Sequence, residues 1–115
     1  MDKDQARAYW DVQAEGFDDE VDHGLTTTAA RSAWWAVMRD KLPEAPACVA
    51  DLGCGTGSLS VLLASRGYEV LGIDLSPEMI RRARQKAAVQ GLSIDFSVGD
   101  ACKPPLDPQS QDVVL

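Results

Sequence analysis

Three carboxylates stand where short apolar segments end, and their spacing suggests a shared ligand. Asp51, Asp74 and Asp100 each close such a segment, and Asp74 follows Asp51 by 23 residues. In nucleotide-binding α/β folds, an acid about 20 residues past a glycine loop accepts hydrogen bonds from ribose hydroxyls. A carboxylate suits this task because both of its oxygens are acceptors. Alternatively, each acid only caps the turn that follows it.

A glycine-rich loop follows Asp51. Gly53, Gly55 and Gly57 alternate with other residues, Cys54 among them, and residues 58–64 then have a helical pattern. A strand that turns through glycines into a helix N-terminus lets a ligand approach the bare backbone. The alternative is a tight turn without a ligand. Since ligands of open α/β sheets bind at the carboxyl edge, the three acids and this loop are expected to converge there.

These motifs resemble class I S-adenosylmethionine-dependent methyltransferases. Residues 51–57 are similar to the family's glycine-rich first motif, and residues 72–76 with Met79 to its second-strand motif. Gly99-Asp100-Ala101 resembles the turn that contacts adenine, and residues 112–115 resemble the start of the fourth strand. The resemblance implies S-adenosylmethionine as cofactor and methyl transfer as the activity. It names no catalytic base.

The resemblance also implies a role for each residue of these motifs. The glycine loop, with Cys54 and Gly57 in it, holds the methionine part of the cofactor. By resemblance, the backbone of Gly53 and Gly55 contacts that part, and Asp51 orders the loop or binds the amino group. Asp74 binds the ribose. Leu75 and Met79 sandwich the adenine ring, and Asp100 and the Ala101 N–H contact its edge. Cys54 is expected to be a small filler rather than a nucleophile.

Two other functions remain open from the sequence. The fingerprint of nicotinamide and flavin Rossmann domains places glycine at its first, third and sixth positions. Counted from Gly53, the sixth position here is Ser58, and the third glycine comes one residue early, at Gly57. This departure favours the methyltransferase loop. A non-catalytic module that binds S-adenosylmethionine or S-adenosylhomocysteine is the other alternative.

Composition limits the classes of partner. The chain has 115 residues, 45% of them hydrophobic, and a formal net charge of −7. No apolar run approaches the ~20 residues that span a bilayer, and the charged start lacks a signal-peptide core, so we expect a cytoplasmic protein without a membrane partner. The acidic balance argues against nucleic acid and favours a small-molecule acceptor. Cys48, Cys54 and Cys102 lack CxxC spacing, so no metal site is predicted.

The N-terminal part, residues 1–43, is predicted to be a helical lid or cap segment. A helix over about 4–14 carries Tyr9 and Trp10, and Phe17 follows. By resemblance, these three aromatic side chains wall the cofactor or acceptor site, although ordinary packing explains them equally well. Thr28 is expected to cap a second helix that runs to about Lys41. Its predicted apolar face comprises Ala30, Ala33, Trp34, Val37 and Met38.

Residues 44–115 are predicted to form the cofactor-binding core of a single α/β domain. Strands near residues 49, 70, 94 and 113 alternate with helices over about 57–67 and 76–91. The second helix is expected to have Ser76 as its N-cap and a buried stripe of Met79, Ile80, Ala83 and Ala87. We expect a Rossmann-like three-layer sandwich with a mostly parallel sheet. The family order 3-2-1-4 would leave the fourth strand as an exposed edge, so we expect a truncated sheet or a homodimer through that edge.

Overall fold

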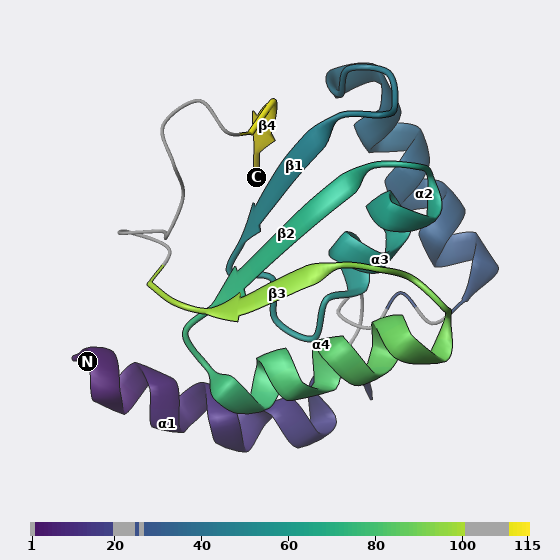
Figure 1. Ribbon diagram of the computed structural model, residues 1–115. Coiled ribbons are helices and arrows are strands. Elements are labelled where there is room, and N and C mark those ends of the chain that lie inside the picture. The colour runs from purple at the N-terminus through teal and green to yellow at the C-terminus, as the bar shows by residue number, and fades with distance from the viewer. Residues whose placement is uncertain (1, 20–24, 26, 101–110) are drawn as a thin grey trace.

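A four-stranded parallel sheet forms the centre of the computed structural model (Figure 1). Its strands are β1 (Cys48–Leu52), β2 (Glu69–Asp74), β3 (Asp95–Val98) and β4 (Val113–Val114), in the order β3-β2-β1-β4. The structure describes residues 2–19, 25, 27–100 and 111–115, without the side chains of 17–19. The predicted strand order and the predicted Rossmann-like α/β class are confirmed.

The strand register brings the predicted site segments to one edge. Asp51 pairs with Gly72, and Asp74 pairs with Val98 on the next strand. All neighbouring strands are parallel, so the segments after β1, β2 and β3 leave the sheet at the same edge. The glycine loop, the turn after Asp74 and the segment up to Asp100 therefore start next to one another.

The two helices that follow β1 and β2 begin and end as the sequence predicts. α3 (Ser58–Ser65) starts after Gly57, and Gly67, at φ +94°, follows its end. α4 (Pro77–Val89) has Ser76 as its N-cap, with the hydroxyl accepting the Met79 N–H at 3.1 Å. The buried residues of α4 are those of the predicted stripe: Met79, Ile80, Ala83 and Ala87.

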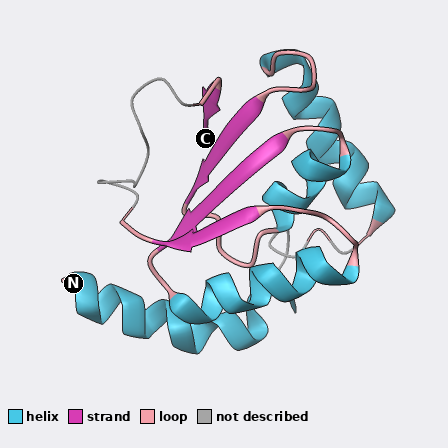
Figure 2. Cartoon of the chain, viewed as in Figure 1, coloured by secondary structure: helices cyan, strands magenta, loops and turns pink. Residues whose placement is uncertain are grey.

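The helices pack on a shared face of the sheet. Val49 of β1 and Val70 of β2 pack against Leu63 of α3, whereas Phe96 of β3 packs against Ile80 of α4. Successive strand residues point to opposite faces, and Gly72, two residues after Val70, faces Phe96. These contacts place α3 and α4 in one layer on the sheet. Figure 2 shows the helices in cyan beside and below the magenta strands. This layer and the sheet are two of the predicted three layers.

α1 (Lys3–Gln13) lies alongside α4 and continues as a 3₁₀ helix, η1 (Ala14–Asp19). It begins with a capping box: the Asp2 carboxylate accepts the Gln5 N–H at 2.8 Å, and the Gln5 side chain accepts the Asp2 N–H at 3.0 Å. The reciprocal bonds satisfy two backbone donors that a helix start leaves open. The predicted first helix is confirmed, and its cap lies earlier than the sequence pattern indicated.

The predictions for α2 (Thr28–Met38), which a short 3₁₀ helix η2 (Arg39–Lys41) follows, were wrong in two respects. The N-cap is Thr27, not Thr28, because Thr27 has the extended backbone of a cap and its hydroxyl accepts the Ala30 N–H at 3.0 Å. The packed face also differs in part: Met38 of the predicted face packs on the core cluster of β1, β2 and α3, whereas Trp34 and Val37 are exposed by 40% and 58%.

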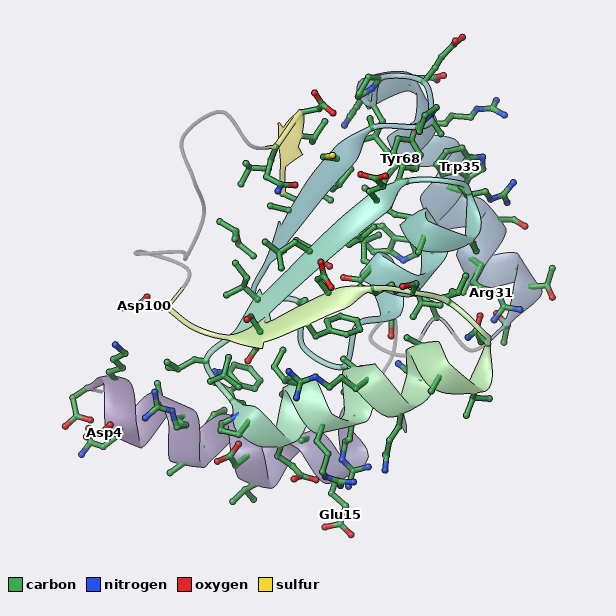
Figure 3. All side chains as sticks on the ribbon, in the orientation of Figure 1. Asp4, Glu15, Arg31, Trp35, Tyr68 and Asp100 are labelled. Carbon is green, nitrogen blue, oxygen red and sulfur yellow. The ribbon has the colours of Figure 1, made fainter. Side chains whose placement is uncertain are left out.

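Trp35 replaces Trp34 as the aromatic anchor of α2. It packs against the core cluster of β1, β2 and α3, with its ring centroid 6.3 Å from that of Tyr68, and Figure 3 shows the two side chains together. The Arg66 guanidinium lies 4.9 Å from the Trp35 ring centroid. Neighbouring helix residues differ by about 100° in direction, so a short helix with several apolar residues offers two similar stripes. In the structure, the stripe that contains Trp35 is the one that packs on the core.

None of the helices in the described part of the chain has the length and apolar character that a membrane crossing requires.

Candidate functional site

A cavity of about 300 Å³ opens at the carboxyl edge of the sheet. It is lined by the glycine loop, the turn after β2, the start of α4, the segment after β3 and α1: Gly53, Gly55, Asp74, Leu75, Met79, Asp100 and Trp10. All seven are residues that the sequence predicted for the cofactor site or its lid. Asp51, Cys54 and Gly57 do not line this cavity, and Ala101 lies outside the described residues.

Two backbone amides orient the Asp74 carboxylate. Its Oδ2 accepts the Gly55 N–H at 2.9 Å, and its Oδ1 accepts the Ser76 N–H at 3.0 Å. Each oxygen can accept a further bond because a carboxylate oxygen has two lone pairs. The carboxylate is therefore fixed in direction and can still accept hydrogen bonds from two neighbouring hydroxyls.

The glycine loop is anchored to β2. The N–H groups of Gly53 and Cys54 both donate to the Ile73 carbonyl, at 2.7 and 2.9 Å. Gly53 and Gly55 have φ of +70° and +58°, in the left-handed region where other residues are strained. The sequence GxGxG at this point is thus required by backbone conformation. It also leaves the wall of the cavity free of side chains at Gly53 and Gly55.

Asp51 lies beneath the loop rather than in the cavity. Its side chain is buried, and Oδ2 accepts the Ser60 hydroxyl of α3 at 2.7 Å. Burial raises the pKa of Asp51; the Ser60 bond opposes this shift, and the charge of Asp74 adds to it. Of the two roles implied for Asp51, the geometry supports the ordering of the loop against α3.

Cys54 and Gly57 serve packing. Cys54 is buried in the cluster of Ile80, Ala83 and Phe96, and burial raises the pKa of its thiol far above the ordinary value. A protonated, buried thiol is a poor nucleophile, in agreement with its interpretation as a filler. A Cβ on Gly57 would lie 2.9 Å from side-chain atoms of Ala83 and Phe96. Both positions let α4 approach the glycine loop closely.

The N-terminal helix contributes to the site. Trp10 lines the cavity. The Tyr9 ring packs edge-on against the Trp10 ring, with centroids 5.0 Å apart, and does not itself line the cavity. Lys3 forms an ion pair with Asp100 at 3.8 Å; Figure 3 shows Asp100 beyond β3, at the end of the molecule where α1 begins. The Phe17 side chain, the third predicted lid residue, lies outside the described residues.

Two residues of α1 that the sequence reasoning missed contact the turn after β2. Arg7 donates from Nε to the Leu75 carbonyl at 3.1 Å. Asp11 accepts the Ser76 hydroxyl through Oδ1, and the same oxygen accepts the Glu78 N–H at 3.1 Å. Lys3, Arg7 and Asp11 are spaced four residues apart, so they share one side of α1. That spacing is visible in the sequence, but it does not reveal which surface the stripe contacts.

The basic run of α4 is engaged within the chain. Arg81 and Arg82 both contact Glu78, and Arg84 donates to the Phe96 carbonyl at 3.0 Å. Lys86 donates to the hydroxyls of Thr56 and Ser58 at 3.1 and 2.8 Å. Among the described residues, no group of three His, Cys, Asp or Glu side chains is placed to hold a metal ion.

Comparisons with known proteins agree with this geometry. Residues 49–115 match a family model described as a methyltransferase domain. The chain is 38% identical over 96 residues to demethylmenaquinone methyltransferase of Deinococcus radiodurans, which covers 82% of this chain and 36% of that protein. The crystal structure of magnesium protoporphyrin IX methyltransferase from Synechocystis PCC 6803 with bound SAM has a TM-score of 0.70 and 28% identity, over 99% of this chain and 61% of that one.

Another structural neighbour has a different chemistry in its title. The [4+2]-cyclase SpnF has a TM-score of 0.68 and 28% identity, over 75% of this chain and 33% of that chain. The chain spans about a third of the length of the curated relatives it matches first.

Proposed function

Because this chain belongs to the methyltransferase domain family, whose cofactor is S-adenosylmethionine (SAM), we propose that it takes part in methyl transfer from SAM to a small-molecule acceptor. The observation that carries the proposal is the cavity in which Gly53, Gly55, Asp74, Leu75, Met79 and Asp100 meet. It combines bare backbone, apolar side chains and two carboxylates at the edge where ligands of parallel sheets bind.

Each lining residue has a role in this proposal. The backbone at Gly53 and Gly55 contacts the methionine part of SAM. Asp74 accepts the ribose hydroxyls through the oxygens that Gly55 and Ser76 orient. Leu75 and Met79 hold the adenine ring between them, and Asp100 accepts from its amino group. Asp51, Cys54 and Gly57 support the loop from below, and Ala101 remains a prediction for the adenine edge.

The chemistry needs little more than positioning. When bound, SAM supplies a methyl group that its positively charged sulfur already activates. Transfer breaks the methyl carbon–sulfur bond, whose electron pair stays on sulfur, and forms a bond from that carbon to an acceptor atom. The chain must hold the methyl carbon in line with the acceptor, which accounts for much of the rate enhancement. In this proposal Trp10, which lines the cavity, packs against the bound cofactor.

A small-molecule acceptor is supported by two observations. The relatives named above act on demethylmenaquinone and magnesium protoporphyrin IX, by their names. The net charge is −7, and the described basic run of α4 is bound to Glu78, Phe96, Thr56 and Ser58. Binding of nucleic acid is driven by clustered positive charge, and the Glu78 carboxylate neutralises part of the charge of this run. The acceptor atom is left open by the proposal.

A second function is binding of the cofactor without methyl transfer. The similarity to a [4+2]-cyclase supports it, because a fold can host several chemistries. Incubation with methyl-labelled SAM and candidate acceptors separates the two functions. Release of S-adenosylhomocysteine (SAH) with label in the acceptor supports transfer, and tight SAH binding without turnover on any acceptor favours the second function.

The N-terminal segment and the sheet edge carry two further parts of the proposal. We assign α1 as the lid of the core at 44–115, because Trp10 lines the cavity, whereas α2 packs on the core through Trp35. β4 lies at one edge of the described sheet, with Val114 55% exposed, and pairing of two such edges would give a homodimer. A solution mass of one chain would contradict the dimer.

Titration calorimetry with SAH tests the cofactor site. In an Asp74→Ala variant the ribose acceptor is lost, so we expect the affinity for SAH to fall about tenfold or more. Asp95→Ala is the control, because Asp95 is exposed at the opposite end of the strands and the substitution removes the same charge. Equal affinities of the Asp74→Ala and parent proteins would remove the ribose assignment. Tighter binding of NADH than of SAH would overturn the proposal.

A further inference from the structure

We infer that Asp11 is a positioning residue for the adenosine half of the cofactor site, a role that rests on the proposed function. Asp11 lies on α1, far in sequence from the turn that it contacts. It bonds two consecutive parts of the α4 N-terminus: the Ser76 hydroxyl and, at 3.1 Å, the Glu78 N–H. These groups lie between Leu75 and Met79, the two side chains that line the cavity from this turn.

Asp11 completes the hydrogen bonding of the α4 N-terminus. The first N–H groups of a helix have no partner within it. Pro77 has no N–H, the Met79 N–H donates to the Ser76 hydroxyl at 3.1 Å, and the Ile80 N–H donates to the Ser76 carbonyl at 3.1 Å. The Glu78 N–H is the remaining donor, and it is satisfied from another helix, by Asp11. The N-cap of α4 is therefore shared between Ser76 and α1.

Asp11 also determines the direction of the Ser76 hydroxyl. A hydroxyl has one proton to donate and can accept with its lone pairs. Here the Ser76 proton goes to Asp11, which leaves the oxygen lone pairs directed at the Met79 N–H. The Ser76 backbone N–H meanwhile orients Asp74 Oδ1 at 3.0 Å. Without Asp11 this hydroxyl loses its fixed acceptor, and the residues on both sides of Ser76 lose a constraint.

Two neighbours of Asp11 on α1 reinforce the same alignment. Arg7, one turn earlier, bonds the Leu75 carbonyl at 3.1 Å, and Lys3, one turn earlier again, pairs with Asp100 at 3.8 Å. Arg7 makes one bond to this turn and Lys3 pairs with Asp100 at the exposed surface, whereas Asp11 makes two bonds to the turn, one of them to the fully buried Ser76. Of the three contacts, the Asp11 contact is therefore the one that most restricts the turn.

Binding of two probes to an Asp11→Ala variant tests the inference. Alanine is the best helix former, so the substitution does not by itself weaken α1. We expect the affinity for SAH to fall by up to about five- to tenfold, because binding must then order a helix start that has lost the stabilisation of one cap contact. The affinity for 5′-methylthioadenosine, which has the adenosine but lacks the amino-acid part, should fall by the same factor. Asp11→Asn keeps an acceptor oxygen and should retain most of the affinity.

Glu15→Ala is the matched control, because Glu15 is an exposed acid of the same N-terminal segment that points away from the site (Figure 3). It should bind both probes like the parent. A double variant with Ser76→Ala tests the route: if Asp11 acts through Ser76, the combined loss is smaller than the product of the single losses. If the losses of affinity in the two single variants multiply in the double variant, that route is contradicted. An Asp11→Ala variant that loses affinity for SAH but not for 5′-methylthioadenosine would also contradict it.

The outcomes separate this inference from the function it rests on. If the parent binds SAH and a folded Asp11→Ala variant binds it equally well, the inference is wrong and the function stands. If the parent binds neither SAH nor 5′-methylthioadenosine, the function fails, and the inference fails with it. If the alanine variant does not fold, Asp11→Ser serves in its place, because its shorter side chain does not reach the Glu78 N–H.

Discussion

At the scale of single residues, the three strand-end carboxylates have different tasks despite similar positions in sequence. Asp74 and Asp100 line the cavity, whereas Asp51 is buried against Ser60 of α3. The difference arises from the loop geometry: the chain turns over Asp51 with the N–H groups of Gly53 and Cys54 bonded to the Ile73 carbonyl. A motif that contains all three acids therefore mixes cavity-lining and structural residues.

Burial of Asp51 has a consequence for the pH dependence of stability. Its pKa is raised, so the folded state binds this proton more tightly than the unfolded state. The contribution of Asp51 to stability therefore falls as the pH rises from its ordinary pKa of about 3.9 through the raised folded value, and is constant above it.

An Asp51→Asn variant keeps an acceptor for Ser60 and loses this titration. We expect its free energy of unfolding, minus that of the parent, to increase with pH across that interval. Urea denaturation at several pH values from 4 to 8 measures the difference, with Asp40→Asn, an exposed acid, as the control. A difference that is independent of pH, or that decreases, would contradict the buried charge.

The glycines and strand-end acids of the cavity were predictable because backbone rules determine them. Gly53 and Gly55 need positive φ, and acids at the ends of parallel strands meet at one edge. Asp11 was not predictable. Its contact joins residues 65 positions apart, and nothing in the sequence tells which helix face will meet the α4 N-terminus. The two roles open for Asp51 could be separated only by its burial.

At the scale of elements, α1 connects the N-terminal segment to the cofactor site. It contacts the turn after β2 through Arg7 and Asp11, and it lines the cavity with Trp10. α2 has a different task, since its Trp35 packs on the core cluster of β1, β2 and α3. Cap residues and glycines predicted the bounds of α3 and α4 well. Periodicity alone predicted the packed face of α2 only in part, with Met38 correct and Trp34 wrong, because two adjacent tryptophans fit a helical stripe equally well.

Tryptophan fluorescence tests the placement of α1. Trp10 and Trp34 are both 40% exposed, but only Trp10 lines the described cavity. We expect SAH to change the fluorescence emission of the parent and of a Trp34→Phe variant. In a Trp10→Phe variant most of this change should be lost. A full signal in Trp10→Phe would show that α1 does not cover the bound ligand.

The packing between the paired strands β2 and β3 depends on a glycine, Gly72, whose register partner is Phe96. A Cβ on Gly72 would lie 2.5 Å from a ring carbon of the buried Phe96. We expect Gly72→Ala to lower the free energy of unfolding by about 1–3 kcal/mol through overpacking. Gly16→Ala is the control, because a Cβ there meets nothing within 4 Å, and its effect should stay within about 0.5 kcal/mol. Equal stability of the Gly72→Ala and parent proteins in thermal or urea unfolding would refute the packing of Phe96 against Gly72.

At the scale of the whole molecule, the parallel sheet gathers segments that are distant in sequence. The order β3-β2-β1-β4 places the turn after β2 between the glycine loop that follows β1 and the segment that follows β3, and α1 covers the same edge from below in Figure 1. The sheet order was predicted from the family resemblance, and the parallel direction of the strands from their alternation with helices. The covering by α1 required the coordinates, because no local pattern determines where an amphipathic helix docks.

The central claim is that one adenosyl group binds across the carboxyl edge of β1, β2 and β3. An ¹⁵N–¹H correlation titration of the full chain with SAH tests it most directly. We expect the largest amide shifts at Gly53, Gly55, Leu75, Met79 and Asp100, saturating together with one dissociation constant. Saturable shifts at residues away from this edge, with these five amides unmoved, would contradict the account.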